Sequence, residues 1–342
     1  MIRRPPRSTQ SRSSAASDVY KRQEVIHDKG SLKMKLDIAG LSDKGRKKEK
    51  NEDFFGIFRT ESTDIKLFED GALLIVADGL GGHIAGDVAS KLAVSLIKDI
   101  LKQEPWQENK NDEVKDLRDE GPLPLLRDAF QKANESIYKT NKDLVKGSRP
   151  MGTTALAAII IPGKIYIANV GDSRAYHIRN GEILEYTEDH SWIDEQVKQG
   201  LMSRSEAEKD TRKHVVTRCI GTHADIEVDV YRWHPVSGDI LLLCTDGLTN
   251  MVSDEQILEI IRKGGTAGEI AQKLVNLANE NGGKDNITAI VTIIEPKLFQ
   301  QLFLKTRLFW RKHSGKILKL LFLLIYGLLC GTLGYFLRGL IK

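Results

Sequence analysis

Carboxylates flank the short apolar segments of this chain, and carboxylate oxygens are ligands that Mg²⁺ and Mn²⁺ prefer. Three apolar segments lead into an acidic residue: 73–77 into Asp78, 165–170 into Asp172, and 240–244 into Asp246. Two others begin after acidic residues: 54–58 after Glu52 and Asp53, and 287–294 after Asp285. One Asp-Gly or Gly-Asp pair is an ordinary turn sequence. Five such junctions in one chain favour a metal site.

The apolar segments at these junctions are short and uninterrupted, which is typical of buried β-strands. If a strand that begins after its acidic residue lies antiparallel to one that ends in its acidic residue, both carboxylates lie at the same edge of the sheet. Carboxylates gathered there would repel one another unless cations lay among them. After Asp78, the glycines Gly79, Gly81 and Gly82 allow a sharp turn and a close approach of the backbone to a ligand.

Seven ordered motifs give the chain a resemblance to a known family. They are NED (51–53), ADGLGGHIAGDVAS (77–90), GTTA (152–155), NVGDSRAY (169–176), TEDHSW (187–192), CTDGL (244–248) and KDNIT (284–288). Their order and spacing resemble those of the metal-dependent Ser/Thr protein phosphatases of type 2C (PPM), in their bacterial form, over roughly residues 35–295. The resemblance implies a phosphoric monoester hydrolase that removes phosphate from phosphoserine and phosphothreonine with a metal-activated water.

The resemblance also implies roles for individual residues. It implies Mg²⁺ or Mn²⁺ as the cofactor, with two ions in the main site and a third, looser ion at Asp172. Asp78 is expected to bridge the two ions, Gly79 to bind by its carbonyl, and Asp53 to act through waters. The residues implied at the metal site are Glu52, Asp53, Asp78, Gly79, Asp172, Asp246 and Asp285. Asp78, Asp246 and Asp285 are the expected catalytic residues. Asn286 and Asp189 are expected to support the site rather than to carry chemistry.

A basic run lies next to the first acidic pair. The first part of 32–55 alternates and predicts an edge strand, after which Arg46 and Lys48 precede the NED motif. Charge runs are usually solvated surface, but this one adjoins the acidic residues, so we predict that Lys48 and Arg46 bind the substrate phosphate. The family carries Arg where this chain has Lys48, which lacks the planar fork. In an extended segment Arg46 would lie on the same face, about 6 to 7 Å away.

The remaining pattern predicts an α+β fold. Helices are expected over 86–101 and 123–145, with these apolar residues at helical spacing: Val88, Leu92, Leu96, Ile100, and Leu126, Phe130, Ala133, Ile137. Two apolar strands around 162–164 form a central hairpin. Helices against strand-rich layers predict the αββα sandwich for which the family is known, with two central antiparallel β-sheets flanked by helices.

The polar segment 188–221 corresponds to the mobile flap that lies beside the active site in the family. Its composition predicts a mainly helical segment. His190 and His214 are candidate acids or bases, but single histidines in polar helices are more often surface residues.

Composition changes at both ends of the chain. Residues 1–30 begin with an Arg- and Ser-rich stretch without the apolar region of a signal peptide, and we expect a disordered, non-native extension before the catalytic domain at 31–296. A basic juxtamembrane segment, 297–319, and an uncharged apolar segment, 320–337, predict one C-terminal transmembrane helix. The excess of Lys and Arg before that helix predicts a single-pass protein of the cell membrane with a cytoplasmic catalytic domain.

The net charge of +4 is small and concentrated near the ends, so nucleic-acid binding is not predicted. The three cysteines form neither a metal-site spacing nor a disulfide framework. Expected partners are phosphorylated proteins, among them a Ser/Thr protein kinase and its substrates. Two alternatives are a narrow regulator of one phosphoprotein, as in a sigma-factor pathway, and a non-catalytic pseudophosphatase that binds phosphoproteins. The complete set of acidic residues disfavours the second alternative.

Overall fold

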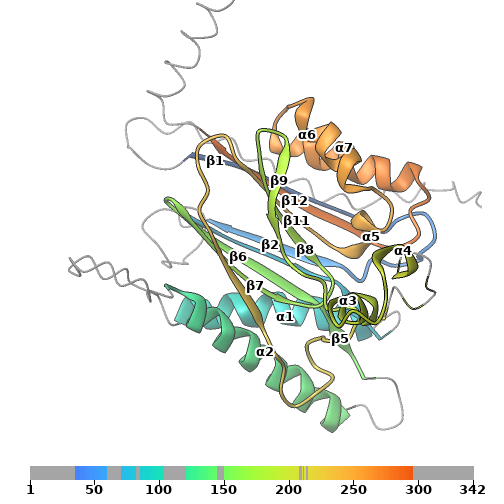
Figure 1. Cartoon of the computed structure of the whole chain (residues 1–342). Helices are drawn as coiled ribbons and strands as arrows, with labels where there is room; N and C mark the ends of the chain where they lie inside the picture. Colours follow the sequence, from blue (N-terminus) through green and yellow to red (C-terminus); the bar gives the residue numbers. More distant parts are fainter. Residues whose placement is uncertain are drawn as a thin grey trace, which may run out of the picture. The chain divides into compact units, whose positions relative to one another are not determined.

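Two five-stranded antiparallel sheets pack face to face between pairs of helices (Figure 1). The computed structural model describes residues 35–59, 71–81, 85–103, 121–144, 150–207, 210, 212 and 215–295. The predicted N-terminal extension, juxtamembrane segment and transmembrane helix lie outside these residues. Within them, no helix combines the length and apolar character needed to cross a membrane.

The sheets are built from strands that are distant in sequence. The first sheet has the order β1 (Lys35–Asp43), β12 (Ile287–Glu295), β11 (Ile240–Cys244), β8 (Arg174–Arg179) and β9 (Glu182–Tyr186). The second has the order β10 (Asp229–Trp233), β7 (Lys164–Val170), β6 (Ala155–Ile161), β3 (Ala72–Ala77) and β2 (Phe54–Arg59). A short pair joins β4 (Gly79–Leu80) to β5 (Gly152–Thr153). The predicted edge strand, central hairpin and antiparallel sheets are confirmed.

Strand β3 is buried on both faces, as its uninterrupted apolar sequence predicts. Leu74 and Val76 face the other sheet, whereas Leu73, Ile75 and Ala77 face the helices. This alternation follows from the period of two in a strand. The apolar core therefore continues from the helical layer through the second sheet into the space between the sheets.

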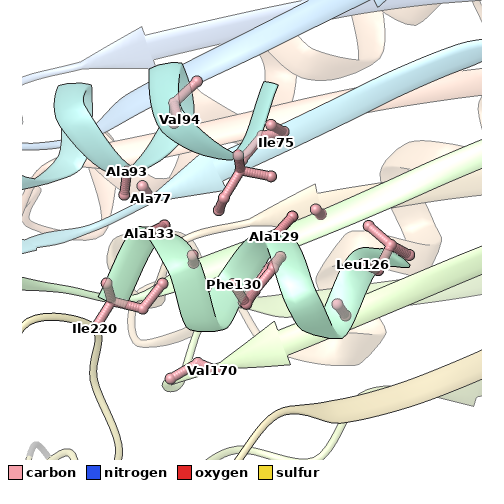
Figure 2. Close-up of a cluster of buried hydrophobic side chains, with 14 of the residues drawn as sticks. Ile75, Ala77, Ala93, Val94, Leu126, Ala129, Phe130, Ala133, Val170 and Ile220 are labelled. Atoms are coloured by element: carbon pink, nitrogen blue, oxygen red, sulfur yellow. The ribbon is translucent and has the colours of Figure 1, made fainter. Parts of the chain in front are cut away.

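Helices α1 (Ala85–Gln103) and α2 (Leu123–Leu144) cover the second sheet. Figure 2 shows labelled side chains of both helices gathered around Ile75 and Ala77 of β3. The predicted buried face of α2 is confirmed, including Phe130. The predicted face of α1 is wrong at Val88, which is 44% exposed, while Ala89 and Ala93 are fully buried. The buried face combines small residues near the start of α1, such as Ala89 and Ala93, with the larger Val94, Ile97 and Leu101 further along the helix.

The first sheet is covered by α6 (Asp254–Arg262) and α7 (Ala267–Glu280). Each begins with a capping box, in which a hydroxyl residue and a residue three positions on satisfy each other's backbone amides: Ser253 with Gln256, and Thr266 with Glu269. A short helix, α5 (Asp246–Thr249), follows β11 directly. The observed layers confirm the α+β sandwich.

One local prediction is wrong, and the extended backbone on which another depended is not found. The residues between β1 and β2 turn at 45–47 instead of running extended, because Gly45 adopts a φ of +77° and the N–H groups of Arg46 and Lys47 donate to the carbonyl of Gly283. The flap is not mainly helical where the structure describes it: it holds α3 (Trp192–Lys198) and α4 (Arg204–Ala207). Gly200, with a φ of +71°, follows the end of α3.

Candidate metal centre

The antiparallel register brings the acidic residues to one end of the sandwich. Phe54 pairs with Ala77, so Asp53 and Asp78 extend from the same end of two neighbouring strands. In the other sheet Cys244 pairs with both Ala289 and Arg174, which places the acids flanking β11, β12 and β8 at one end as well. The chain crosses between the sheets through 171–173 and through 44–53. We call the resulting group the acidic rim: Glu52, Asp53, Asp78, Asp172, Asp246 and Asp285.

The aspartates of the acidic rim lie close enough to act on one another's protonation. Burial raises the pKa of Asp78 well above its usual range, and the charges of Asp53, Asp246, Asp172 and Asp285 raise it further. Burial also raises the pKa of Asp172, together with the charges of Asp246 and Asp189. A bound cation would relieve this repulsion.

Asp53 is the most completely enclosed carboxylate of the NED motif, with 5% of its surface exposed. Its Oδ2 accepts hydrogen bonds from the hydroxyls of Thr245 at 2.8 Å and Thr288 at 2.6 Å. Its Oδ1 is buried and has no hydrogen-bond partner among the described residues. Burial raises the pKa of Asp53 to about 7, with the charges of Asp246 and Asp285 adding to the effect. A buried carboxylate oxygen in this state fits a site for a cation or its water.

Glu52 and the carbonyl of Gly79 meet beside the first turn of α1. A Cβ atom added to Gly86 would lie 2.7 Å from Glu52 Oε2 and 2.8 Å from the Gly79 oxygen. The space that both oxygens face therefore exists because residue 86 has no side chain. Sequence reasoning missed Gly86, although a glycine inside a helix costs stability and so signals a special requirement.

Asn286 fixes the backbone that carries Glu52. Its Oδ1 accepts from the N–H of Glu52 at 2.8 Å, and its Nδ2 donates to the carbonyls of Lys44 and Lys50 at 2.9 and 2.8 Å. All of these contacts are to main-chain atoms. Asn286 thus supports the site, as the sequence predicted.

Lys48 lies at the acidic rim, with its Nζ 2.5 Å from Asp285 Oδ1. Although burial acts in the opposite direction, the hydrogen bond and charge of Asp285 and the charges of Asp78 and Glu52 raise the pKa of Lys48. Arg46 is exposed in the turn beside Gly283. The segment is not extended, so the condition under which Arg46 would share a face with Lys48 is not met, and the binding of phosphate by either residue stays a prediction.

A pocket of about 300 Å³ adjoins Asp172 and Asp246. The flap supplies one wall of it, including Ile193 and Asp194. Another wall is Arg174, whose guanidinium donates to both oxygens of Asp189, at 2.9 and 2.5 Å. Asp189 thus holds Arg174 beside Asp172, and its supporting role at a metal site stays a prediction.

His190 is not the surface residue that its polar surroundings predicted. It is 4% exposed, its Nδ1 accepts from the N–H of Gly171 at 3.1 Å, and its Nε2 lies 3.2 Å from Asp229 Oδ2. These contacts attach the beginning of the flap to the turn that carries Asp172. The side chain of His214 lies outside the described residues.

The donors at the acidic rim are all oxygens, which suits Mg²⁺ or Mn²⁺ better than a metal that prefers nitrogen or sulfur. In the described part of the chain, no group of three or more Asp, Glu, His or Cys side chains has the geometry to hold a metal ion by itself. The expected ligands also include the Gly79 carbonyl, and Asp53 offers an unused buried oxygen. The chemical type of these donors therefore suits Mg²⁺ or Mn²⁺, while the contact of each residue with an ion stays a prediction.

Known proteins of one family resemble this chain in sequence and in fold. The family model for protein phosphatase 2C matches residues 45–291. The serine/threonine phosphatase stp of Listeria monocytogenes is 38% identical over 262 residues, covering 76% of this chain and 96% of that protein. The structure of the S. agalactiae serine/threonine phosphatase aligns with a TM-score of 0.66 at 32% identity, over 76% of this chain and 100% of that one. The catalytic domain of PstP in complex with two manganese ions aligns with a TM-score of 0.61 at 30% identity, over 76% of this chain and 99% of that one.

The fold and the matches define the class of protein: the chain belongs to the protein phosphatase 2C family. It is a serine/threonine phosphatase, and phosphorylated proteins are its substrates. The family is metal-dependent. The resemblance inferred from the seven motifs is thereby confirmed at the level of family and reaction.

Proposed function

We propose that this phosphatase hydrolyses phosphoserine and phosphothreonine with two Mg²⁺ or Mn²⁺ ions bound at the acidic rim and a third, looser ion at Asp172. The observation behind the proposal is that Asp53, Asp172, Asp246 and Asp285 lie close enough to Asp78 for their charges to add to the effect of desolvation in raising its pKa. The manganese ions of the PstP structure support the choice of metal.

The residues that would hold the ions flank strands of both sheets. Asp78 would serve both ions, Glu52 and the Gly79 carbonyl one of them, Asp246 and Asp285 the other, Asp53 would act through waters, and Asp172 would hold the third ion. When bound, such ions lower the pKa of water toward neutrality and stabilise negative charge on a phosphate. Asp53 is buried, which limits the access of bulk water to its carboxylate, whereas Asp78 is only partly buried.

Lys48 is proposed to bind the substrate phosphate. Its raised pKa keeps the ammonium charged at neutral pH, and its contact with Asp285 holds it at the rim. With 43% of its side chain exposed, Lys48 can reach a phosphate that approaches from solvent. An ammonium supplies one compact charge, so the position of the phosphate depends more on the metal site than it would with Arg.

We further propose that the protein opposes Ser/Thr protein kinases at the cytoplasmic face of the cell membrane. The support is the uncharged segment 320–337 and the basic residues that precede it. Both lie outside the described residues.

A peptide assay tests the proposed reaction. The full-length protein, solubilised in detergent, should release phosphate from a phosphothreonine peptide with Mn²⁺, stop in EDTA, and recover when Mn²⁺ is added in excess. Asp78→Asn is the inactive control. Retained peptide binding without turnover in Mn²⁺, or turnover that EDTA leaves unchanged, would contradict the proposal.

A further inference from the structure

Two buried threonines hold one oxygen of Asp53 and leave the other available. Thr245, which precedes α5, and Thr288, the second residue of β12, are both fully buried. Each hydroxyl donates to the same atom, Asp53 Oδ2. Asp53 Oδ1 is buried with no hydrogen-bond partner within the described ranges. The two oxygens of Asp53 therefore have different functions.

The two hydroxyls belong to a network in which the direction of each hydroxyl hydrogen bond can be assigned. The hydroxyl of Thr245 accepts from the N–H of Thr288 at 3.0 Å, which leaves its proton for Asp53. Asn51 Nδ2 donates to Ser42 Oγ at 2.8 Å, and Ser42 Oγ lies 2.8 Å from Thr288 Oγ1. Since Thr288 donates to Asp53, it accepts from Ser42. The network thus directs its protons toward Asp53 Oδ2 and connects the NED motif to β1, β11 and β12.

These two hydrogen bonds determine which oxygen of Asp53 is available to a proton, a water or a cation. Because Oδ2 already accepts two hydroxyl protons, a further proton, a water or a cation can approach only Oδ1. Rotation of the carboxylate would break both bonds and leave two hydroxyls unsatisfied in the core, which is costly. The threonines therefore lock the orientation of the carboxylate.

We propose that Thr245 and Thr288 are positioning residues of the metal centre, which hold Asp53 so that Oδ1 is presented to an ion of the acidic rim or to a water on that ion. The inference rests on the proposed function, because it requires the rim to bind metal. Loss of such a supporting hydrogen bond typically lowers metal affinity by about 10- to 100-fold. The threonines touch neither substrate nor ion, so they act through Asp53 alone.

Isosteric substitutions in the full-length protein test the proposal. Thr288→Val and Thr245→Val replace each hydroxyl by a methyl group, and calorimetric titration with Mn²⁺ measures affinity without reference to turnover. We expect each to weaken Mn²⁺ binding about tenfold or more. Thr288→Ser keeps the hydroxyl and should retain affinity within about threefold.

Thr292→Val is the matched control. Thr292 lies on the same strand, is fully buried, and its hydroxyl has no hydrogen-bond partner in the part of the chain that the structure describes. We expect this variant to bind Mn²⁺ within about twofold of the wild type. An equal loss of affinity in Thr292→Val would overturn the proposal, because it would indicate a general effect on packing.

Wild-type affinity in both Thr288→Val and Thr245→Val would overturn this inference and leave the proposed function intact. Absence of Mn²⁺ binding by the wild type would overturn both. If circular dichroism shows that Thr288→Val is unfolded, Thr245→Val is compared with Thr245→Ser instead. A loss of Mn²⁺ affinity of about tenfold in Thr245→Val but not in Thr245→Ser supports the proposal, and equal affinities overturn it.

Discussion

At the scale of single residues, Lys48 distinguishes this chain from the family pattern. Lys48→Arg should lower the KM for a phosphopeptide several-fold, because a guanidinium can donate two parallel hydrogen bonds to phosphate. The kcat should change little if the gain is equal in the ground and transition states. Steady-state kinetics at saturating Mn²⁺ measure both constants.

Arg46 supplies the control for the Lys48 prediction. Arg46 is exposed in the turn at 45–47, whereas Lys48 contacts Asp285 of the acidic rim. Arg46→Ala should therefore change the KM less than Lys48→Ala, which should raise it about tenfold for a lost charge-assisted contact. The effects of the two substitutions should add in the double variant. Unchanged kcat/KM in Lys48→Ala, with and without Arg46, would show that residue 48 does not contact the phosphate.

Asp53 makes the stability of the metal-free protein depend on pH. Burial raises its folded-state pKa to about 7, whereas an Asp in an unfolded chain titrates near about 3.9. The folded state binds the proton more tightly, so this contribution to stability is complete below about pH 4 and is lost as the pH rises through about 7. In EDTA, the Tm of the wild type should therefore fall between about pH 5 and 7.5 more steeply than that of Asp53→Asn.

Circular dichroism melts at several pH values measure this difference. Mn²⁺ should also raise the wild-type Tm more at pH about 7.5 than at about 5, because the ion replaces protons that the acidic carboxylates hold at low pH. Parallel Tm profiles for the wild type and Asp53→Asn would show that Asp53 is not the group responsible.

The acidic residues themselves could be predicted from sequence, because each stands beside one end of an apolar strand. The residues that hold them in place could not be predicted from sequence. Thr245 and Thr288 are ordinary β-strand residue types, and only the pairing of β11 with β12 brings both hydroxyls to Asp53. His190 is polar in a polar segment, and its burial depends on a long-range contact with Asp229.

At the scale of elements, the first turn of α1 must pass close to the metal site. Gly86→Ala should strengthen the helix by up to about 1 kcal/mol from propensity alone, yet the new methyl would lie within 3 Å of Glu52 Oε2 and the Gly79 oxygen, at 2.7 and 2.8 Å. We expect Mn²⁺ affinity to fall about tenfold or more, while the far-ultraviolet circular dichroism stays unchanged. Titration calorimetry gives the affinity.

Gly268→Ala is the control for Gly86→Ala, because Gly268 is also the second residue of a helix, α7, after an alanine. This variant should gain up to about 1 kcal/mol in the free energy of unfolding and keep its metal affinity. If Gly86→Ala binds Mn²⁺ as tightly as Gly268→Ala does, the oxygens beside Gly86 are not metal ligands.

Helices and strands whose apolar residues recur at regular spacing could be predicted from the sequence. Segments whose conformation depends on a turn could not. Strand β3 and helix α2 follow directly from their apolar patterns. The contact face of α1 was predicted one position too early, because Val88 and Leu92 carry a stronger apolar signal than the fully buried Ala89 and Ala93, although Ile97 and Leu101 follow them on the same face. The turn at 45–47 depends on an acceptor, Gly283, that lies far away in sequence.

At the scale of the whole molecule, the catalytic fold and the apolar C-terminal segment should be separable. Truncation after residue 296 removes the basic and apolar segments and keeps all of β12. We expect the truncated protein to move from the membrane fraction to the soluble fraction with kcat/KM for a soluble phosphopeptide unchanged. Cell fractionation with immunoblotting measures the first effect and peptide kinetics the second. Recovery of the full-length protein in the soluble fraction would contradict the membrane anchor.

The sandwich as a whole brings carboxylates from both sheets to one end. We propose that these carboxylates bind the ions on which catalysis depends. Calorimetric titration of Mn²⁺ into the full-length wild type and into Asp78→Asn tests the claim most directly. The wild type should bind two ions, with a third more weakly, and Asp78→Asn should lose the binding of the two ions together with turnover. Wild-type stoichiometry, affinity and turnover in Asp78→Asn would contradict it.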